Sequence, residues 1–333
     1  MKKKIVVIGG GTGTYTILTG LKKHRELDLS VIVTMMDSGG SNRIIRDEFG
    51  LLPTSDLRQC IVALSSEKPS EIVRELFTYR YSQGTGISGM TFGNLFMAAL
   101  TDIYGSQEEA IEKTCEFLDC QGKIIPVTFD NSQLVARYSN GRQVLGEHLI
   151  DEPTESENKG LKIVELDTIP KARANKKAID AINNADLIVL GPGDLFTSII
   201  PNLVVEGIVE AVNNSKANVM YIVNLTTKFN ETNGYKASDF VKELEKYTKM
   251  GRINICLVHK DGDFPKEVLE RYIEENAFPV EDDLNTFKEH SLRVVRGNFI
   301  SDTVYEKAKG DNLRRSLIRH DPDKLAKAII SLL

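Results

Sequence analysis

Short runs of apolar residues alternate with amphipathic stretches along most of the chain. The apolar runs are typical of buried strands and span residues 5–8, 31–35, 123–128, 187–190, 219–223 and 253–258. Between several of these runs, apolar residues recur at helical spacing over residues 55–64, 70–81, 94–103, 107–118, 237–247 and 265–275. This alternation predicts an α/β fold with a doubly wound, mostly parallel sheet that helices cover on both faces.

The middle of the chain departs from that pattern. Residues 123–167 hold shorter alternating segments around the turn sequence Ser139-Asn140-Gly141, which is typical of a hairpin. The polar stretch 151–160 is predicted to be a solvent-exposed loop. We therefore expect a small antiparallel insertion at residues 123–167 within a single domain of residues 1–333; a second independent domain is compatible with the pattern but is not required by it.

Composition narrows the classes of function. The 333 residues carry 42 basic and 47 acidic side chains, a net charge of −5, so no global positive field attracts nucleic acid as a partner. The four cysteines show no CxxC pair and are expected to be reduced core thiols rather than zinc ligands or disulfides. No apolar run reaches the length of a membrane span, and the first residues lack the pattern of a signal peptide, so we expect a cytoplasmic protein.

The first apolar run leads directly into the sequence GGGTGT and then into a helical pattern. Glycines after a buried strand let the backbone turn sharply and approach a ligand, and the first amides of a helix point unpaired at that turn. This pattern predicts a phosphate site, and a tight strand-to-helix corner without a ligand is the alternative. The residues concerned are Gly9, Gly10, Gly11, Thr12, Gly13 and Thr14.

A second loop of small residues follows the second apolar run. Two such loops after adjacent parallel strands meet at the carboxyl edge of a sheet, where ligands bind in open α/β folds. Asp37 lies near the position of the ribose-binding acid of dinucleotide enzymes, but its neighbours fit a second phosphate or a metal better; they are Gly39, Gly40 and Ser41. Capping of a following helix by Asp37 or Ser38 is the alternative.

Further polar loops follow later in the chain. Asn94 comes after a glycine and hydroxyl loop and offers a donor and an acceptor to a sugar or base, with a flexible lid as the alternative. The sequence GPGD contributes Gly191, Gly193 and Asp194, and Asn224 follows the next apolar run. Together, these strand-end loops indicate a site for an elongated phosphorylated ligand.

The chain lacks the motifs of several enzyme classes. No HExxH, GxSxG or GxxxxGK[ST] sequence occurs, which disfavours a zinc protease, an α/β-hydrolase and a Walker-type nucleotide hydrolase. Asp56, in LPTSDLR, is expected in the first turn of a helix, where a structural role suffices. Arg319, in IRHD, is a candidate for contact with a diphosphate because guanidinium suits bidentate phosphate binding; helix capping by Asp321 is the alternative.

The chain resembles the gluconeogenesis factor (YvcK) branch of the 2-phospho-L-lactate transferase (CofD) family. The resemblance lies in the motifs GGGTGT, DSGGSN, LPTSDLRQ, GNLFMAAL, GPGDLFTSIIPNLVV and NLTTKFNETNGYKASD, in this order, and in ERYIEENAFPV and IRHD. It implies a Rossmann-like fold, a homodimer and a nucleotide at the glycine loops. It also implies that Tyr272 stacks on a uracil and that Arg319 contacts the diphosphate.

The two branches of that family imply different activities. The transferase branch joins a phospho-carboxylic acid, such as phosphoenolpyruvate or phospholactate, to a deazaflavin with a guanosine nucleotide and Mg²⁺. The gluconeogenesis factor branch is linked to binding of UDP-N-acetylglucosamine and to control of carbon flux and cell-wall growth.

Two departures from the family pattern favour binding over catalysis. Ser38 stands where relatives carry a second aspartate, and Met90 replaces a histidine, so a potential metal ligand and a potential acid or base are missing. We therefore expect a regulatory protein that binds a nucleotide sugar, with a transferase that uses Mg²⁺ at Asp37 as the rival. An NAD-dependent oxidoreductase is the third candidate function. It is disfavoured because no catalytic pair is apparent and Thr14 stands at the third glycine position of GxGxxG.

Overall fold

Seven parallel strands form the main sheet within the part of the chain that the computed structural model describes. That part comprises residues 2–66, 71–153, 160–260, 264, 266–302 and 317–333. The strands lie in the order β10-β9-β8-β7-β1-β2-β3. Their bounds are β1 (Lys3–Gly9), β2 (Leu27–Val33), β3 (Lys123–Pro126), β7 (Leu187–Leu190), β8 (Asn218–Ile222), β9 (Ile255–His259) and β10 (Arg293–Gly297). The expected doubly wound sheet is confirmed, and β1 and β7 are the central neighbours at which the strand order reverses.

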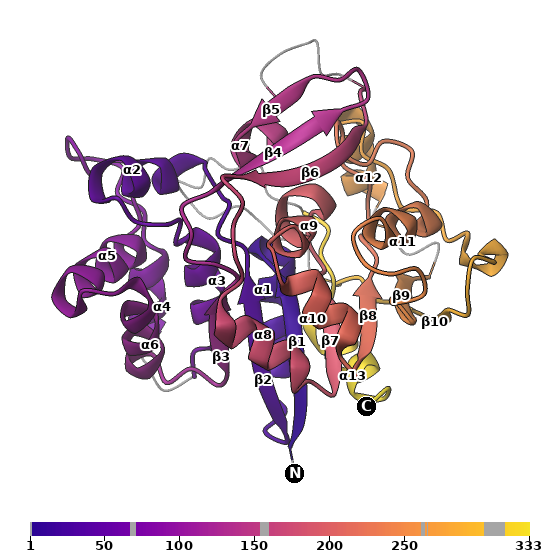
Figure 1. Cartoon of the computed structure of the whole chain (residues 1–333), viewed down its shortest axis with the longest axis horizontal. Coiled ribbons are helices and arrows are strands. Elements are labelled where there is room, and N and C mark those ends of the chain that lie inside the picture. Colours follow the sequence, from indigo (N-terminus) through magenta and orange to yellow (C-terminus); the bar gives the residue numbers. More distant parts are fainter. Residues whose placement is uncertain (1, 67–70, 154–159, 261–263, 265, 303–316) are drawn as a thin grey trace.

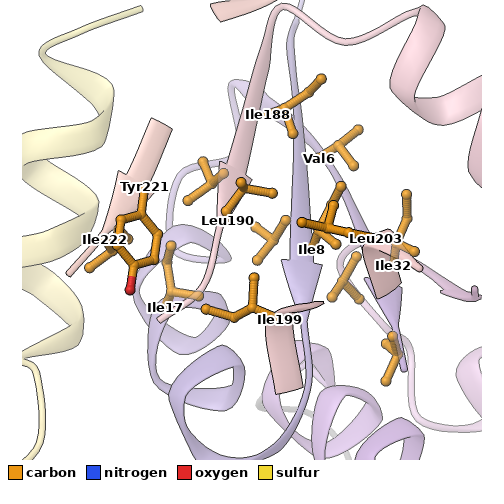
Figure 2. Packing of buried hydrophobic residues seen from close by; sticks show 14 of the residues in the cluster. Val6, Ile8, Ile17, Ile32, Ile188, Leu190, Ile199, Leu203, Tyr221 and Ile222 are labelled. Atoms are coloured by element: carbon orange, nitrogen blue, oxygen red, sulfur yellow. The ribbon is translucent and has the colours of Figure 1, made fainter. Parts of the chain in front are cut away.

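The central strands are buried on both faces. Residues 5–8 of β1 pair in register with residues 29–32 of β2 and 187–190 of β7, and those four residues of β1 are at most 2% exposed. A strand covered on both sides reads as a continuous apolar run, which is why the sequence identifies it. Figure 2 shows side chains of neighbouring strands, among them Ile8, Ile32 and Leu190, in one packed cluster.

Helices pack against both faces and one flank of the sheet. One group contains α1 (Gly11–Leu21), α3 (Ser55–Leu64) and α13 (Pro322–Ile330), and a second contains α8 (Lys176–Asn183), α9 (Ile200–Leu203) and α10 (Ile208–Asn214). The helices α11 (Ala237–Glu245) and α12 (Lys266–Glu274) follow β8 and β9. Figure 1 shows a flank beyond β3, built from α2 (Gly40–Phe49), α4 (Glu71–Thr78), α5 (Phe92–Tyr104) and α6 (Gln107–Phe117). None of the described helices has the length and apolar character that crossing a membrane requires.

A three-stranded antiparallel sheet lies at the end of the molecule opposite the N-terminus (Figure 1). It consists of β4 (Gln133–Tyr138), β5 (Gln143–Leu145) and β6 (Ile163–Ile169), in the order β5-β4-β6. It begins later than residue 123, because β3 pairs in parallel with β2 and belongs to the main sheet. The short helix α7 (Glu147–Asp151) follows β5. We call residues 133–169 the insertion.

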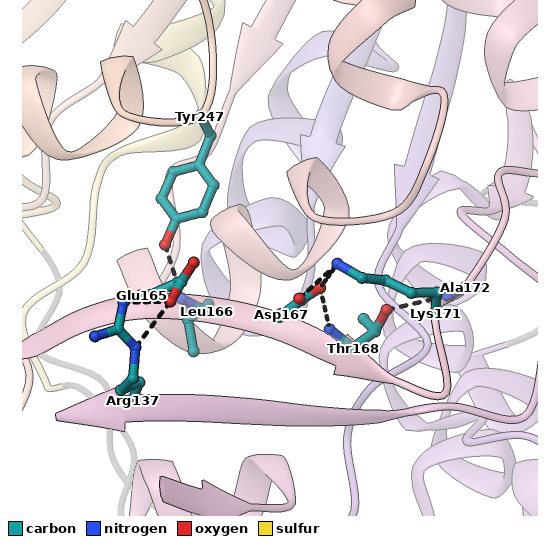
Figure 3. Close-up of polar contacts among 8 residues, drawn as sticks. All are labelled: Arg137, Glu165, Leu166, Asp167, Thr168, Lys171, Ala172 and Tyr247. Carbon is teal, nitrogen blue, oxygen red and sulfur yellow. Dashed lines mark hydrogen bonds and ion pairs between the residues drawn. The ribbon is translucent and has the colours of Figure 1, made fainter. Parts of the chain in front are cut away.

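Hydrogen bonds fix the insertion to the body of the protein. The backbone N–H of Leu166 in β6 donates to the hydroxyl of Tyr247, just after α11, at 3.0 Å (Figure 3). Within the insertion itself, Arg137 of β4 forms an ion pair with Glu165 of β6. The insertion therefore sits over the carboxyl ends of the main strands in a defined orientation.

Candidate functional site

A cavity of about 710 Å³ opens at the carboxyl ends of β1, β7 and β8. Six chain segments line it, within residues 10–16, 151–153, 192–198, 224–230, 271–277 and 317–320. Its volume falls in the range of small-ligand sites, and its place beside β1 and β7 is the switch point at which open α/β sheets bind ligands.

The structure brings about half of the predicted binding residues to this cavity. The residues that line it are Gly10, Thr12, Gly13, Gly193, Asp194, Asn224, Tyr272 and Arg319. Gly9, Gly11, Thr14 and Gly191 are neighbours of these residues in the chain but do not line the cavity. Asp37, Gly39, Gly40, Ser41 and Asn94 are not among the lining residues.

Close backbone packing explains the glycine at position 13. A Cβ atom there would lie 2.3 Å from the carbonyl oxygen of Pro192, which no real side chain tolerates. The first turn of α1 can therefore contact the loop after β7 only because residue 13 has no side chain. This contact places the two glycine loops side by side at the floor of the cavity.

The start of α1 already holds a carboxylate. Gly10, the residue before the helix, has no side chain with which to cap it, and the backbone N–H of Gly11 donates to Asp56. Burial, together with the nearby charges of Asp37 and Asp151, raises the pKa of Asp56 to about 7. Asp56 was interpreted from sequence as an ordinary first-turn residue, because its partner lies more than forty positions earlier in the chain.

Four carboxylates, Asp37, Asp56, Glu147 and Asp151, influence one another near the glycine loops, and Asp151 is the member of this group that lines the cavity. Burial raises the pKa of Asp37, and the charge of Asp151 adds to that effect. Burial also raises the pKa of Glu147 well above its usual value, reinforced by Asp37, Asp151 and Asp56. Their mutual influence shows that these groups lie within electrostatic range of one another. The loop after β2 is thus part of the site's electrostatics, although it does not line the cavity.

The helix α7 connects the insertion to that loop. The backbone N–H of Ser38 donates to Glu147 at 3.3 Å, and the N–H of His148 donates to the hydroxyl of Ser38 at 3.0 Å. Asp37 accepts from the N–H of Gly39 at 2.9 Å, one residue before α2 begins. The sequence interpretation gave a helix after this loop only as the alternative, capped by Asp37 or Ser38; α2 does begin there, but its N-cap residue is Gly39 and no side chain caps it.

The described residues contain no group of three His, Cys, Asp or Glu side chains that could hold a metal ion by themselves. Mg²⁺ is commonly held by one or two carboxylates together with phosphates of the ligand. Asp37 therefore stays a prediction as a metal ligand, and it would need a phosphate ligand beside it.

Lys228, on the loop after β8, stands at the centre of a second charged group. Its ammonium lies 2.9 Å from Asp194 and 2.8 Å from Glu231, and it also contacts Asp151 at the end of α7. Burial opposes its positive charge, but the three carboxylates outweigh that effect and raise the pKa of Lys228 well above its usual value. The expected exposed loop at 151–160 therefore begins with a half-buried residue that bonds into the site; residues 154–159 lie outside the described part.

Hydrogen bonds hold the remaining loops in place. The side-chain amide of Asn224 donates to the carbonyl of Gly193 at 2.9 Å, which joins the loops after β7 and β8. The hydroxyl of Tyr272 accepts from the backbone N–H groups of Leu317 at 2.9 Å and Ile318 at 3.2 Å. Tyr272 thus fixes the segment that carries Arg319.

Asn94 has a different environment from that of the cavity residues. It is fully buried, its backbone N–H donates to the hydroxyl of Thr91 at 3.3 Å, and its side-chain amide donates to Ser55 at 3.5 Å. Its contacts therefore join the start of α5 to the start of α3, behind the ligand cavity.

Comparison with known proteins places the chain in a family. The model of the family described as 2-phospho-L-lactate transferase CofD matches residues 5–300. A relative from Aquifex aeolicus is 40% identical over 339 residues, covering 100% of this chain and 98% of the relative. The gluconeogenesis factor of Bacillus subtilis is 36% identical over 333 residues, covering 100% of this chain and 98% of that protein.

A solved structure agrees with this assignment. A crystal structure from Bacillus halodurans, described as a member of the UPF0052 family, superposes with a TM-score of 0.88 at 33% identity and covers 99% of both chains. The chain therefore belongs to the 2-phospho-L-lactate transferase CofD family, in the branch of the gluconeogenesis factors.

Proposed function

We propose that this protein binds a nucleotide sugar of the UDP-N-acetylglucosamine type and acts in the cytoplasm as a regulatory protein linked to carbon flux and cell-wall growth. The observation that carries the proposal is the cavity at the switch point, which extends from Gly10 and Gly13 to Tyr272 and Arg319. Backbone amides at the start of α1 suit phosphate, and a guanidinium suits the diphosphate.

A transferase of the CofD type is the second candidate function. The group of four carboxylates near the glycine loops favours it. Two of them, Asp37 and Asp56, could share Mg²⁺ with the phosphates of a guanosine nucleotide. Such an enzyme would join a phospho-carboxylic acid to a deazaflavin.

Calorimetric titration distinguishes the two candidates. The purified protein is titrated with UDP-N-acetylglucosamine, UDP, GDP, GTP and NAD, with and without Mg²⁺. We expect saturable binding of the UDP-sugar and a loss of about tenfold in affinity for Arg319→Ala, the effect of one charged hydrogen-bonding group. A preference for GDP or GTP that depends on Mg²⁺, with deazaflavin turnover that Asp37→Asn abolishes, would establish the transferase instead.

We further propose that residues 1–333 act as one unit whose partner is a second copy of the chain, as the family resemblance implies. The helices α4, α5 and α6 carry the exposed apolar side chains of Ile72, Leu76, Ile103, Tyr104 and Phe117, which we call the apolar flank. Exposed apolar side chains on helices that pack together, as α4, α5 and α6 do, suit an interface between proteins.

A further inference from the structure

Lys228 is the cationic side chain at the glycine end of the cavity. Its loop is joined to Gly193 through Asn224, and its ammonium bonds to Asp194, the residue after Gly193. A Cβ atom on Gly193 would lie 3.6 Å from the carbonyl oxygen of Gly10, so the loop after β7 touches the start of α1. A phosphate bound at the first turn of α1 would therefore have Lys228 as its neighbouring cation.

Three carboxylates surround the ammonium of Lys228, and two of them, Asp151 and Asp194, accept hydrogen bonds from it. It contacts Asp151, Asp194 and Glu231, which come from the insertion, the loop after β7 and its own loop. We propose that Asp151 and the ligand's phosphates compete for Lys228, so that Asp151 of the insertion releases Lys228 when a diphosphate binds. This proposal rests on the proposed function, because it concerns the same cavity.

The charges around Lys228 explain why one carboxylate must move away from it when a diphosphate binds. Burial raises the pKa of Glu231 to about 8, and the positive charge of Lys228 opposes that shift. Asp151 and Asp194 still outnumber the single lysine. A diphosphate that entered without displacing a carboxylate would meet like charges at close range, which opposes its binding in a partly desolvated site.

Position explains why Asp151 is the carboxylate that leaves. Glu231 is 1% exposed, and Asp194 begins a π-helix, η2 (Leu195–Ile199), whose backbone amides bond to its carbonyl. Asp151 instead ends the five-residue helix α7 of the insertion, and its second contact is the hydroxyl of Thr197 at 3.3 Å. Losing Lys228 leaves Asp151 with that hydroxyl and with solvent.

Opposite effects of two substitutions test the competition. Calorimetry with UDP, uridine and inorganic diphosphate is run on the native chain, on Lys228→Met and on Asp151→Asn. We expect Lys228→Met to weaken UDP and diphosphate binding about tenfold or more, the effect of losing a charged hydrogen bond, while uridine binding is unchanged. We expect Asp151→Asn to strengthen UDP binding about threefold, as suits an ion pair partly open to solvent.

The ion pair between Lys171 and Asp167 supplies matched controls. It lies at the end of the insertion, outside the cavity (Figure 3), so Lys171→Met and Asp167→Asn should leave all three affinities unchanged. Lys228→Arg, which keeps the charge, should retain UDP binding, and thermal melting checks that each variant is folded.

If Lys228→Met and Asp151→Asn weaken UDP and uridine alike, the contact is structural and the proposal is wrong. If the native chain prefers GDP to UDP, the proposed function fails instead, and the same variants test the competition with GDP.

Discussion

Tyr272 illustrates how one side chain can serve a site by positioning another. Its ring belongs to a small hydrophobic cluster with Leu225, Ala277, Ile300 and Ile318, separate from the main core. Its hydroxyl accepts two backbone N–H groups from the segment before Arg319. The resemblance implied stacking on a uracil, and the structure adds a second role that does not depend on the ligand.

Removing that hydroxyl should weaken ligand binding without unfolding the protein. In Tyr272→Phe the ring keeps its packing, but two backbone amides lose their acceptor, which costs about 1–3 kcal/mol and loosens the segment that carries Arg319. We expect about a tenfold loss in calorimetric affinity for the UDP-sugar. Tyr235→Phe, which removes a hydroxyl bonded to Glu243 outside the cavity, is the control and should lower thermal stability only. Equal affinities for native protein and Tyr272→Phe would show that the hydroxyl does not position Arg319.

The sequence predicts those cavity residues that a short sequence pattern marks. Gly10, directly after β1, and Gly13, in the first turn of α1, could be predicted as cavity residues from their spacing in the sequence alone. Asp56, Asp151 and Lys228 carry no such signal, because each acquires its role from partners that are distant in the chain and come close only when the sheet and the insertion assemble.

The helix α1 shows how an element depends on close packing at both of its ends. A Cβ atom on Gly13 would lie 2.3 Å from the carbonyl oxygen of Pro192, and one on Gly20 would lie 2.1 Å from that of Pro322. The first contact belongs to the cavity and the second to the packing of α1 against α13. The same helix thus has one close glycine contact at the cavity and another in its packing against α13.

Alanine at the two positions should separate these roles. Each substitution overpacks the helix, and we expect each to lower the free energy of unfolding by about 1–3 kcal/mol in chemical denaturation. Gly13→Ala should also abolish measurable binding of the UDP-sugar, because α1 and the loop after β7 move apart. Gly20→Ala should retain the native affinity. Full binding by folded Gly13→Ala would contradict the assignment of this turn to the site.

Well-buried helices and strands are the ones that the sequence predicts best. The strand β7 and the helix α3 lie at the bounds that the sequence predicts, because an unbroken apolar run and a clear helical period mark them. The strand β10 was missed, since it is an edge strand of sequence RVVRG with no fully buried residue. The helix α2 was considered only as an alternative, because its sequence GSNRIIRDEF begins with a glycine and holds few apolar residues.

At the scale of the whole molecule, ligand cavity and apolar flank occupy different parts. The cavity lies at the carboxyl ends of the strands, whereas the flank helices α4, α5 and α6 lie beyond the edge strand β3 (Figure 1). A dimer formed through the flank would leave both the cavity and the insertion uncovered. Dimerisation and binding should therefore respond to different substitutions.

A charge placed on the apolar flank should convert the proposed dimer to a monomer. Ile103 on α5 and Met250 after α11 are 70% and 73% exposed, but only Ile103 belongs to the flank. Burying a charge at an apolar interface without a partner costs several kcal/mol, so Ile103→Glu should elute as a monomer in size-exclusion chromatography with light scattering. Met250→Glu should remain a dimer, and both variants should bind the UDP-sugar with native affinity. A native chain that is monomeric at all concentrations would refute the homodimer, and a dimeric Ile103→Glu would place the interface on another surface.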